Sequence, residues 1–161
     1  ALATCDKIAV MDAGRIVQLA DPLTLYDAPA SRFAAAFVGR SSQLPATVTA
    51  VDGSIARMRI DGLAAEVGGR LHRPVPVGQA VLIALRPEKV QLGAPGTGAV
   101  DGRLQSRVFQ GSSWLFSIQT ELGSVLVSEP HRGIPHFREG DAVSIAWMPE
   151  DATVVPEAPR G

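Results

Sequence analysis

The sequence predicts a mainly β fold made of two copies of one small unit. Residues 78–92 read GQAVLIALRPEKVQL and residues 140–154 read GDAVSIAWMPEDATV, and seven of their first eleven positions are identical. In both copies an apolar run typical of a buried strand meets a proline, which has no N–H for a ladder hydrogen bond, so the strand must end or turn there. Because an internal repeat indicates the architecture, we place the units at residues 44–93 and 99–155, with a tail at 156–161.

The segments upstream of the two copies support the same division. Thr47–Ile55 and Gln105–Ser113 each read as a β-rich run, a glycine turn and a second β-rich run. A strand–turn–strand pattern shared without common origin is the alternative explanation. In either case the repeated apolar strands should fill the core. The side chains expected there are those of Val81, Ile83, Leu85, Val143, Ile145 and Trp147.

A β hairpin is predicted before the repeat. Residues 1–5 read as the tail of a helix that lacks a start signal, which suggests that the chain is a fragment. Two β-rich runs follow at residues 7–11 and 15–19. Gly14, in the turn between them, suits the positive φ of a three-residue hairpin loop.

Two short helices should follow this hairpin. Asp21 is a good N-cap, and Pro22 fits the first position of a helix. Ser31 can cap a second helix, which Gly39 can end. Residues 41–43 then read as a polar linker.

Composition excludes several classes of protein. The net charge is -1, from 15 basic and 16 acidic residues, and aromatic residues make up 5%. The chain therefore lacks both the basic surface and the stacking aromatics of a nucleic-acid-binding module, so we expect no nucleic-acid partner. Its one cysteine, Cys5, excludes an internal disulfide and is typical of a reducing compartment. No apolar run approaches the ~20 residues that span a bilayer.

No set of residues indicates catalysis or metal binding. His131 and His136 flank a loop that contains glycine and proline, but a metal site would need a further ligand such as Glu129 or Glu139. Histidines on a surface loop are the favoured interpretation.

Glu88 and Glu150 recur in the repeat, and a pair of carboxylates could perform acid–base chemistry. Solvated turns after the two strands are the simpler interpretation. Arg86 has no counterpart in the second copy, because Met148 replaces it, and this argues against a symmetric catalytic site.

Residues 1–40 resemble the end of the nucleotide-binding domain in ATP-binding subunits of ABC importers, in the group that serves maltose, sulfate, iron and polyamines. In that family the segment follows the loop of the switch histidine and reads D-I-x-V-M-x-x-G-x-I, then x-P-x-x-x-Y-x-x-P and F-V-A-x-F-I-G. The matching residues here are Asp6, Ile8, Val10, Met11, Gly14, Ile16, Pro22, Tyr26, Pro29, Phe33, Ala34, Phe37 and Gly39. The sequence departs from the pattern at Ala35, Ala36 and Val38.

The remainder resembles the C-terminal regulatory region of the same subunits, the transport-associated OB-type (TOBE) domain. The family's features are L-R-P-E after a strand, a G-S turn and a late W-x-P-E-D. This chain has Leu85–Glu88, Phe109–Ser113 and Trp147–Asp151 at those places, and the second of these looks most like the polyamine subunits. The resemblance implies that the two β units of residues 44–155 are small OB-type barrels.

The same resemblance implies which parts of an ATPase the chain lacks. It contains no G-x-x-x-x-G-K-[ST] phosphate loop, no LSGGQ-like signature and no apolar strand that ends in Asp-Glu. The switch histidine of the family would precede Ala1. We therefore expect no catalytic residue, cofactor or metal in this fragment. ATP and Mg are expected only for a nucleotide-binding domain that lies outside it.

For the whole subunit, the resemblance implies ATP-driven uptake of a small solute, such as a polyamine, through membrane-spanning permease subunits. That places it in the cytoplasm, on the inner face of the cell membrane. The β region is expected to self-associate as a homodimer and to receive a regulatory protein or small molecule. The candidate interface and regulatory residues are Arg86, Pro87, Glu88, His131, His136, Phe137, Trp147, Pro149 and Glu150.

A small-ligand-binding OB module is the alternative function. An oxyanion would need clustered backbone N–H groups and hydroxyls around a dimer cleft. Thr49, Ser112 and Ser113 could supply the hydroxyls.

Overall fold

The computed structural model describes residues 4–157, which fold mainly as β strands. The chain begins with a hairpin of β1 (Ile8–Asp12) and β2 (Arg15–Ala20), followed by helices α1 (Pro22–Asp27) and α2 (Arg32–Phe37). The predicted hairpin and both predicted helices are therefore present. Of the helix tail expected at residues 1–5, the first three residues lie outside the described part and the other two are not helical.

Side-chain caps explain where both helices begin. The Asp21 carboxylate accepts hydrogen bonds from the backbone N–H of Thr24 at 2.9 Å and from its hydroxyl at 2.6 Å. Ser31 Oγ accepts from the Ala34 N–H at 3.1 Å. Gly39, just after α2, has φ +122°, a conformation that side chains disfavour. The predicted caps and the glycine end are thus confirmed.

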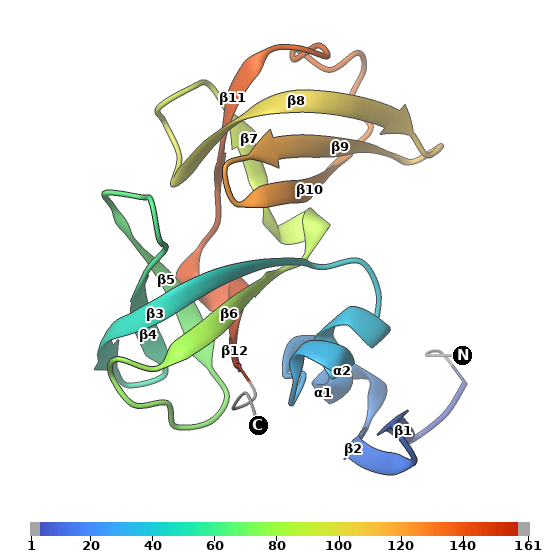
Figure 1. The fold of residues 1–161 in the computed structure, drawn as a ribbon. Helices are drawn as coiled ribbons and strands as arrows, with labels where there is room; N and C mark the ends of the chain where they lie inside the picture. The colour runs from blue at the N-terminus through green and yellow to red at the C-terminus, as the bar shows by residue number, and fades with distance from the viewer. Residues whose placement is uncertain (1–3, 158–161) are drawn as a thin grey trace.

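A closed five-stranded barrel follows the helices (Figure 1). Its strands are β3 (Ser42–Asp52), β4 (Ile55–Arg59), β5 (Glu66–Leu71), β6 (Ala80–Leu85) and β12 (Ala152–Pro156), in the order β12-β5-β4-β3-β6. Neighbouring strands are antiparallel, except that β12 and β5 pair in parallel. Because β3 already begins at Ser42, two residues of the expected linker belong to the barrel.

The second unit is a five-stranded sheet that lies above the barrel in Figure 1. Its strands are β7 (Gln91–Gly93), β8 (Val100–Phe109), β9 (Ser113–Thr120), β10 (Gly123–Pro130) and β11 (Ala142–Ala146), in the order β10-β9-β8-β11-β7. Within the described residues its outer strands, β10 and β7, do not pair. The mainly β fold is therefore confirmed, and the structure adds that only the first of the two units closes into a barrel.

The two repeated sequences fold alike and exchange their last strands. β6 leads through a single 3₁₀ turn, η1 (Pro87–Lys89), into β7, and β11 leads through η2 (Pro149–Asp151) into β12. β7 joins the sheet of the second unit, whereas β12 returns to close the barrel of the first. The five strands of the second unit, β7 to β11, are consequently consecutive in the chain, whereas the barrel needs β12 from beyond them to close.

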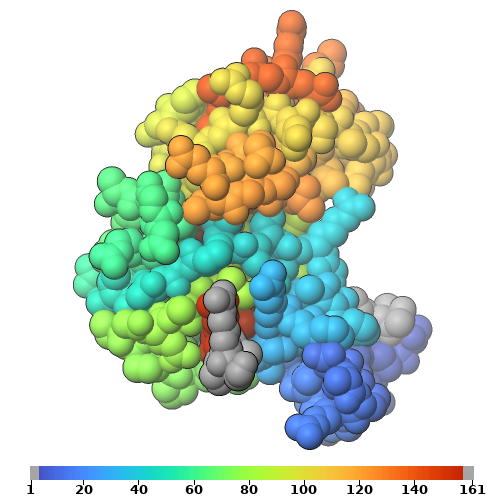
Figure 2. Space-filling view, viewed as in Figure 1, coloured from blue at the N-terminus to red at the C-terminus, as the bar shows by residue number. Residues whose placement is uncertain are grey.

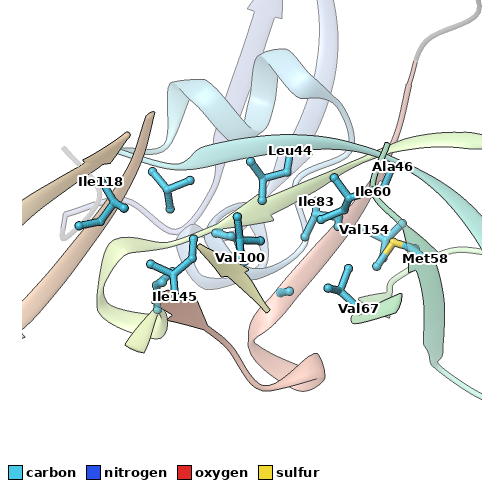
Figure 3. Packing of buried hydrophobic residues seen from close by; sticks show 14 of the residues in the cluster. Leu44, Ala46, Met58, Ile60, Val67, Ile83, Val100, Ile118, Ile145 and Val154 are labelled. Carbon is cyan, nitrogen blue, oxygen red and sulfur yellow. The ribbon is translucent and has the colours of Figure 1, made fainter. Parts of the chain in front are cut away.

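One hydrophobic core runs through both units (Figure 3). Leu44, Ile83 and Val154 of the barrel belong to the same cluster as Ile118 and Ile145 of the second sheet. Five of the six side chains expected in the core are at most 1% exposed, and the sixth, Trp147, is partly buried against the cluster. Apolar surface shared in this way stabilises the pair of units rather than either one alone.

Residues 8–38 form a small cluster of their own beside the barrel. Val10, Leu25, Ala34 and Val38 are buried in it. Figure 2 shows this segment in blue, lying against the lower part of the molecule. A row of apolar side chains on the same segment is exposed: Met11, Ile16, Leu19, Leu23, Phe33 and Phe37.

Candidate functional site

Arg86 joins the N-terminal segment to the barrel. Its side chain is 7% exposed, and its guanidinium carbon lies 4.2 Å from the centre of the Tyr26 ring. The guanidinium donates hydrogen bonds to three backbone carbonyl oxygens, those of Tyr26 at 3.2 Å, Gly39 at 3.4 Å and Ala35 at 3.5 Å. A planar group with five donors suits such a set of acceptors and the aromatic face together.

Other contacts reinforce this junction. The Tyr26 hydroxyl donates to the Glu88 carboxylate, and the Thr153 hydroxyl donates to the carbonyl oxygen of Asp27 at 3.0 Å. Ala35 is buried in a small apolar cluster with Leu82, Ala84 and Val155 of the barrel. Burial lowers the pKa of the Arg86 guanidinium from its ordinary value, and Asp27 partly opposes this. We call this junction, made by Tyr26, Ala35, Gly39, Arg86 and Glu88, the arginine clamp.

In the second copy of the repeated sequence, the residues around η2 contact strand β5 instead of a helix. The Trp147 indole N–H donates to the Gly68 carbonyl oxygen at 3.1 Å, and the Arg70 guanidinium donates to the Glu150 carbonyl oxygen at 3.3 Å. A Cβ on Gly68 would lie 2.7 Å from Pro149, so β5 needs glycine where it crosses η2. Met148, the counterpart of Arg86, is 55% exposed.

An exposed aromatic cluster lies at the tip of the β8–β9 hairpin. The ring centres of Phe109 and Trp114 are 5.0 Å apart, and those of Phe109 and His131 are 4.9 Å apart. The Trp114 indole N–H donates to His131 Nδ1 at 3.2 Å, and the Arg107 guanidinium lies 5.8 Å from the Trp114 ring centre. Phe109 is 48% exposed and Ile134, on the loop after β10, is 86% exposed.

A cavity of about 750 Å³ opens between β7 and β10, and we call it the seam cavity. Its walls include Leu92, Trp114, Phe116, Glu129, His136 and Phe137. Glu88 also borders it, from the side of the arginine clamp. Burial raises the pKa of the Glu129 carboxyl above its ordinary value, and Arg132 partly offsets the rise.

The predicted site residues thus fall into three places. Arg86, Pro87 and Glu88 lie at the arginine clamp, Trp147, Pro149 and Glu150 at the contact of η2 with β5, and His131, His136 and Phe137 around the aromatic cluster and the seam cavity. Among the family-motif residues, Pro29 is buried, whereas Asp6 and Phe37 are exposed. Within residues 4–157, no three His, Cys, Asp or Glu side chains converge as metal ligands would.

The sequence pattern of the TOBE domain family matches residues 83–155. This range begins inside β6 and contains the whole second unit, together with the strand that closes the barrel. Residues 83–155 therefore carry the sequence pattern of a TOBE domain. The upstream strands β3, β4 and β5 complete the barrel into which this domain inserts β12.

The chain is also similar to ATP-binding subunits of import systems. It is 41% identical to the spermidine/putrescine import ATP-binding protein PotA of Rubrobacter xylanophilus, over 91% of this chain and 40% of that protein. It is 38% identical to a PotA of Pseudomonas aeruginosa, over 91% of this chain and 43% of that protein. An Fe(3+) ions import ATP-binding protein of Rhizobium meliloti is 34% identical, over 81% of this chain and 36% of that protein. The chain therefore spans about 40% of the length of such relatives.

A solved structure shares the fold of most of the chain. The cytoplasmic molybdate-binding protein ModG superposes with a TM-score of 0.58 at 12% identity, covering 71% of this chain and 96% of that one. Identity this low indicates a common fold only. Within the described residues of the present chain, neither helix has the length and apolar character needed to cross a bilayer.

Two features of the site escaped the sequence analysis. Tyr26 is the partner of Arg86, yet the two residues are 60 positions apart and no local pattern connects them. Glu129 follows Val125 and Val127 at intervals of two, so strand alternation places it on the inward face. That alternation was the signal that could have found the seam cavity.

Proposed function

We propose that this chain is the C-terminal regulatory and dimerisation region of the ATP-binding subunit of an ABC importer. The observation that carries the proposal is the arginine clamp, which attaches the segment resembling the end of a nucleotide-binding domain to the β region. The similarity to import ATP-binding proteins along most of the chain supports it. The exposed apolar row of the N-terminal segment suits a surface that packs against the remainder of such a domain.

In this proposal the β region moves as one body with the ATP-binding domain. A closed two-fold contact between two β regions would then keep two subunits together while their nucleotide sites open and close. We expect this contact to be made by the aromatic cluster together with Ile134. Aromatic and aliphatic side chains dominate the centre of interfaces, and this surface exposes both kinds.

Sedimentation equilibrium of the intact subunit and of this chain tests the dimer. Ile134→Ser should weaken self-association about tenfold or more, since it removes an exposed aliphatic anchor. Val77→Ser is the matched control, because Val77 is 62% exposed on the barrel, away from the aromatic cluster. A monomeric chain, together with an intact subunit whose ATP-dependent pairing survives deletion of residues 41–161, would overturn the proposal.

The remaining parts of the proposal concern the whole transporter. The subunit would bind ATP and Mg in its nucleotide-binding domain, contact membrane-spanning permease subunits through that domain and lie in the cytoplasm against the membrane. The transported solute would be a small molecule such as a polyamine, in line with the names of two similar proteins.

The oxyanion-binding alternative has less support. Its favourable observation is the fold shared with a molybdate-binding protein. The hydroxyl of Thr49 is engaged with the carbonyl oxygen of Arg57, and Thr49 belongs to a different sheet from Ser113. The candidate hydroxyls therefore do not come together in one chain.

A further inference from the structure

The second unit stays open at the place where the first unit closes. Both units have the same strand order when counted from equivalent strands, β5-β4-β3-β6-β12 and β10-β9-β8-β11-β7. The first unit closes because Thr153 and Val154 of β12 pair with Arg70 and Leu71 of β5. The equivalent pair, β7 and β10, leaves the seam cavity between its strands. β10 ends on Pro130, which has no N–H to donate to a closing ladder.

Glu129 points toward the interior at this opening. It lies two residues after Val127 and four after Val125, both fully buried, so the three side chains share one face of β10. Its cross-strand partner is Trp114, whose side chain occupies the same face of β9. Phe116, the next side chain along that face, is 1% exposed. The carboxylate thus stands among aromatic rings at the end of a core-facing row.

This carboxylate has no direct partner in the described residues. It makes no hydrogen bond and no ion pair within residues 4–157, and Arg132 acts on it only at longer range. The inward face of β5, the equivalent strand, carries Val67, Gly69 and Leu71. A half-buried, unpaired charge costs free energy that an apolar residue would not, and such a carboxyl in a cleft is a candidate binding group.

We propose that the seam cavity binds a small organic cation. Its ammonium or guanidinium group would lie against Glu129, in the cavity that Glu88 also borders, and its apolar body would lie against Trp114 and Phe116. Negative carboxylates together with the face of an indole attract cations and repel oxyanions. A volume of about 750 Å³ is within the range of small-molecule sites.

The two arginines near the cavity leave this preference in place. Arg107 donates to the carbonyl oxygen of Phe137 at 3.1 Å and lies over one face of Trp114, so it is already engaged. Arg132 is exposed, and water screens its charge. The site does not depend on dimer formation, because every wall belongs to one chain.

Three small molecules that share a phenyl ring but differ in charge test the proposal on the full chain. The probes are benzylammonium, benzyl alcohol and benzoate, titrated while the indole N–H signals of the two tryptophans are followed by NMR. Benzylammonium should bind about fivefold or more tightly than the other two probes and should shift the Trp114 signal. Trp147 does not border the cavity and is the internal control. Equal shifts with benzoate, or no shift with any probe, would overturn the proposal.

Glu129→Gln keeps the size of the side chain and removes its charge. It should weaken benzylammonium binding about fivefold or more and leave benzyl alcohol unaffected. Glu66→Gln, at an exposed position on β5, is the matched control and should bind like the unmodified chain. If both variants bind benzylammonium equally well, Glu129 does not recognise the cation and the inference fails. Because sedimentation reports the dimer separately, failure here leaves the dimer proposal intact.

Discussion

Single residues show how the two copies of one motif have diverged. Arg86 and Met148 occupy equivalent positions before a 3₁₀ turn, yet Arg86 is buried under the N-terminal segment and Met148 is exposed. A guanidinium can be buried here only because carbonyl oxygens and a tyrosine face surround it. Glu129 is the opposite case, a carboxylate at the edge of the core that has no direct partner among residues 4–157.

The position of Glu129 predicts a specific pH dependence of stability. Its pKa is raised by burial, so the folded chain holds this proton more tightly than the unfolded chain does. Its contribution to stability therefore falls as the pH rises from its ordinary pKa through the raised value. Glu129→Gln removes this loss, so its free energy of unfolding relative to the unmodified chain should be higher at pH 7 than at about pH 4.

Urea unfolding at the two pH values measures this difference. Glu66→Gln, which changes an exposed carboxylate, provides the control for general effects of net charge. A Glu129→Gln variant with the same relative stability at both pH values would show that burial does not destabilise the ionised form of this carboxyl.

At the scale of elements, β12 links the ends of the β region. Ala152, Val154 and Val155 are at most 3% exposed, and the strand pairs with both β6 and β5. Removing it would expose two strand edges and open the core of the barrel, although it is the last strand among the described residues.

Deletion of residues 152–161 is therefore expected to abolish cooperative unfolding, whereas deletion of residues 158–161 is expected to preserve it. Each buried valine contributes about 1.5–3 kcal/mol, which is a large share of the stability of a small domain. Thermal unfolding followed by circular dichroism distinguishes these outcomes. A cooperative transition in the shorter chain would mean that the barrel closes without β12.

At the scale of the whole molecule, the arginine clamp joins two parts that have separate apolar clusters. All three carbonyl acceptors of Arg86 lie in residues 26–39. We expect residues 41–161 to remain a folded β protein after residues 1–40 are removed, since the main core lies within them.

A double-mutant cycle measures the clamp itself. Arg86→Met, which copies Met148, should lower the free energy of unfolding of the full chain by about 2 kcal/mol, because buried carbonyl groups lose their donor. In the chain that lacks residues 1–40 the same substitution should cost almost nothing. Arg57→Met, at an exposed position on β4, is the control and should be near neutral in both chains. If Arg86→Met lowers the free energy of unfolding equally in both chains, Arg86 stabilises the barrel itself and not its junction with residues 1–40.

The sequence alone determined the β class, the repeat, the helix caps and the resemblance to importer subunits. These features depend on short-range signals: a proline after an apolar run, a capping side chain three residues before its partner, a glycine where φ is positive. The core prediction succeeded for the same reason, because alternating apolar residues in the repeated strands leave little choice of inward face.

Only the tertiary structure decided where the repeated motifs act. Strand exchange places β7 and β12 in each other's units, and no local pattern encodes which edge a strand will join. Arg86 meets Tyr26 across 60 residues, and Glu129 lies at an opening that exists because β10 and β7 fail to pair. Contacts of this kind depend on how distant strands close around a shared core. In the sequence alone, the buried Arg86 and the inward Glu129 are therefore indistinguishable from ordinary polar residues on turns and strand ends.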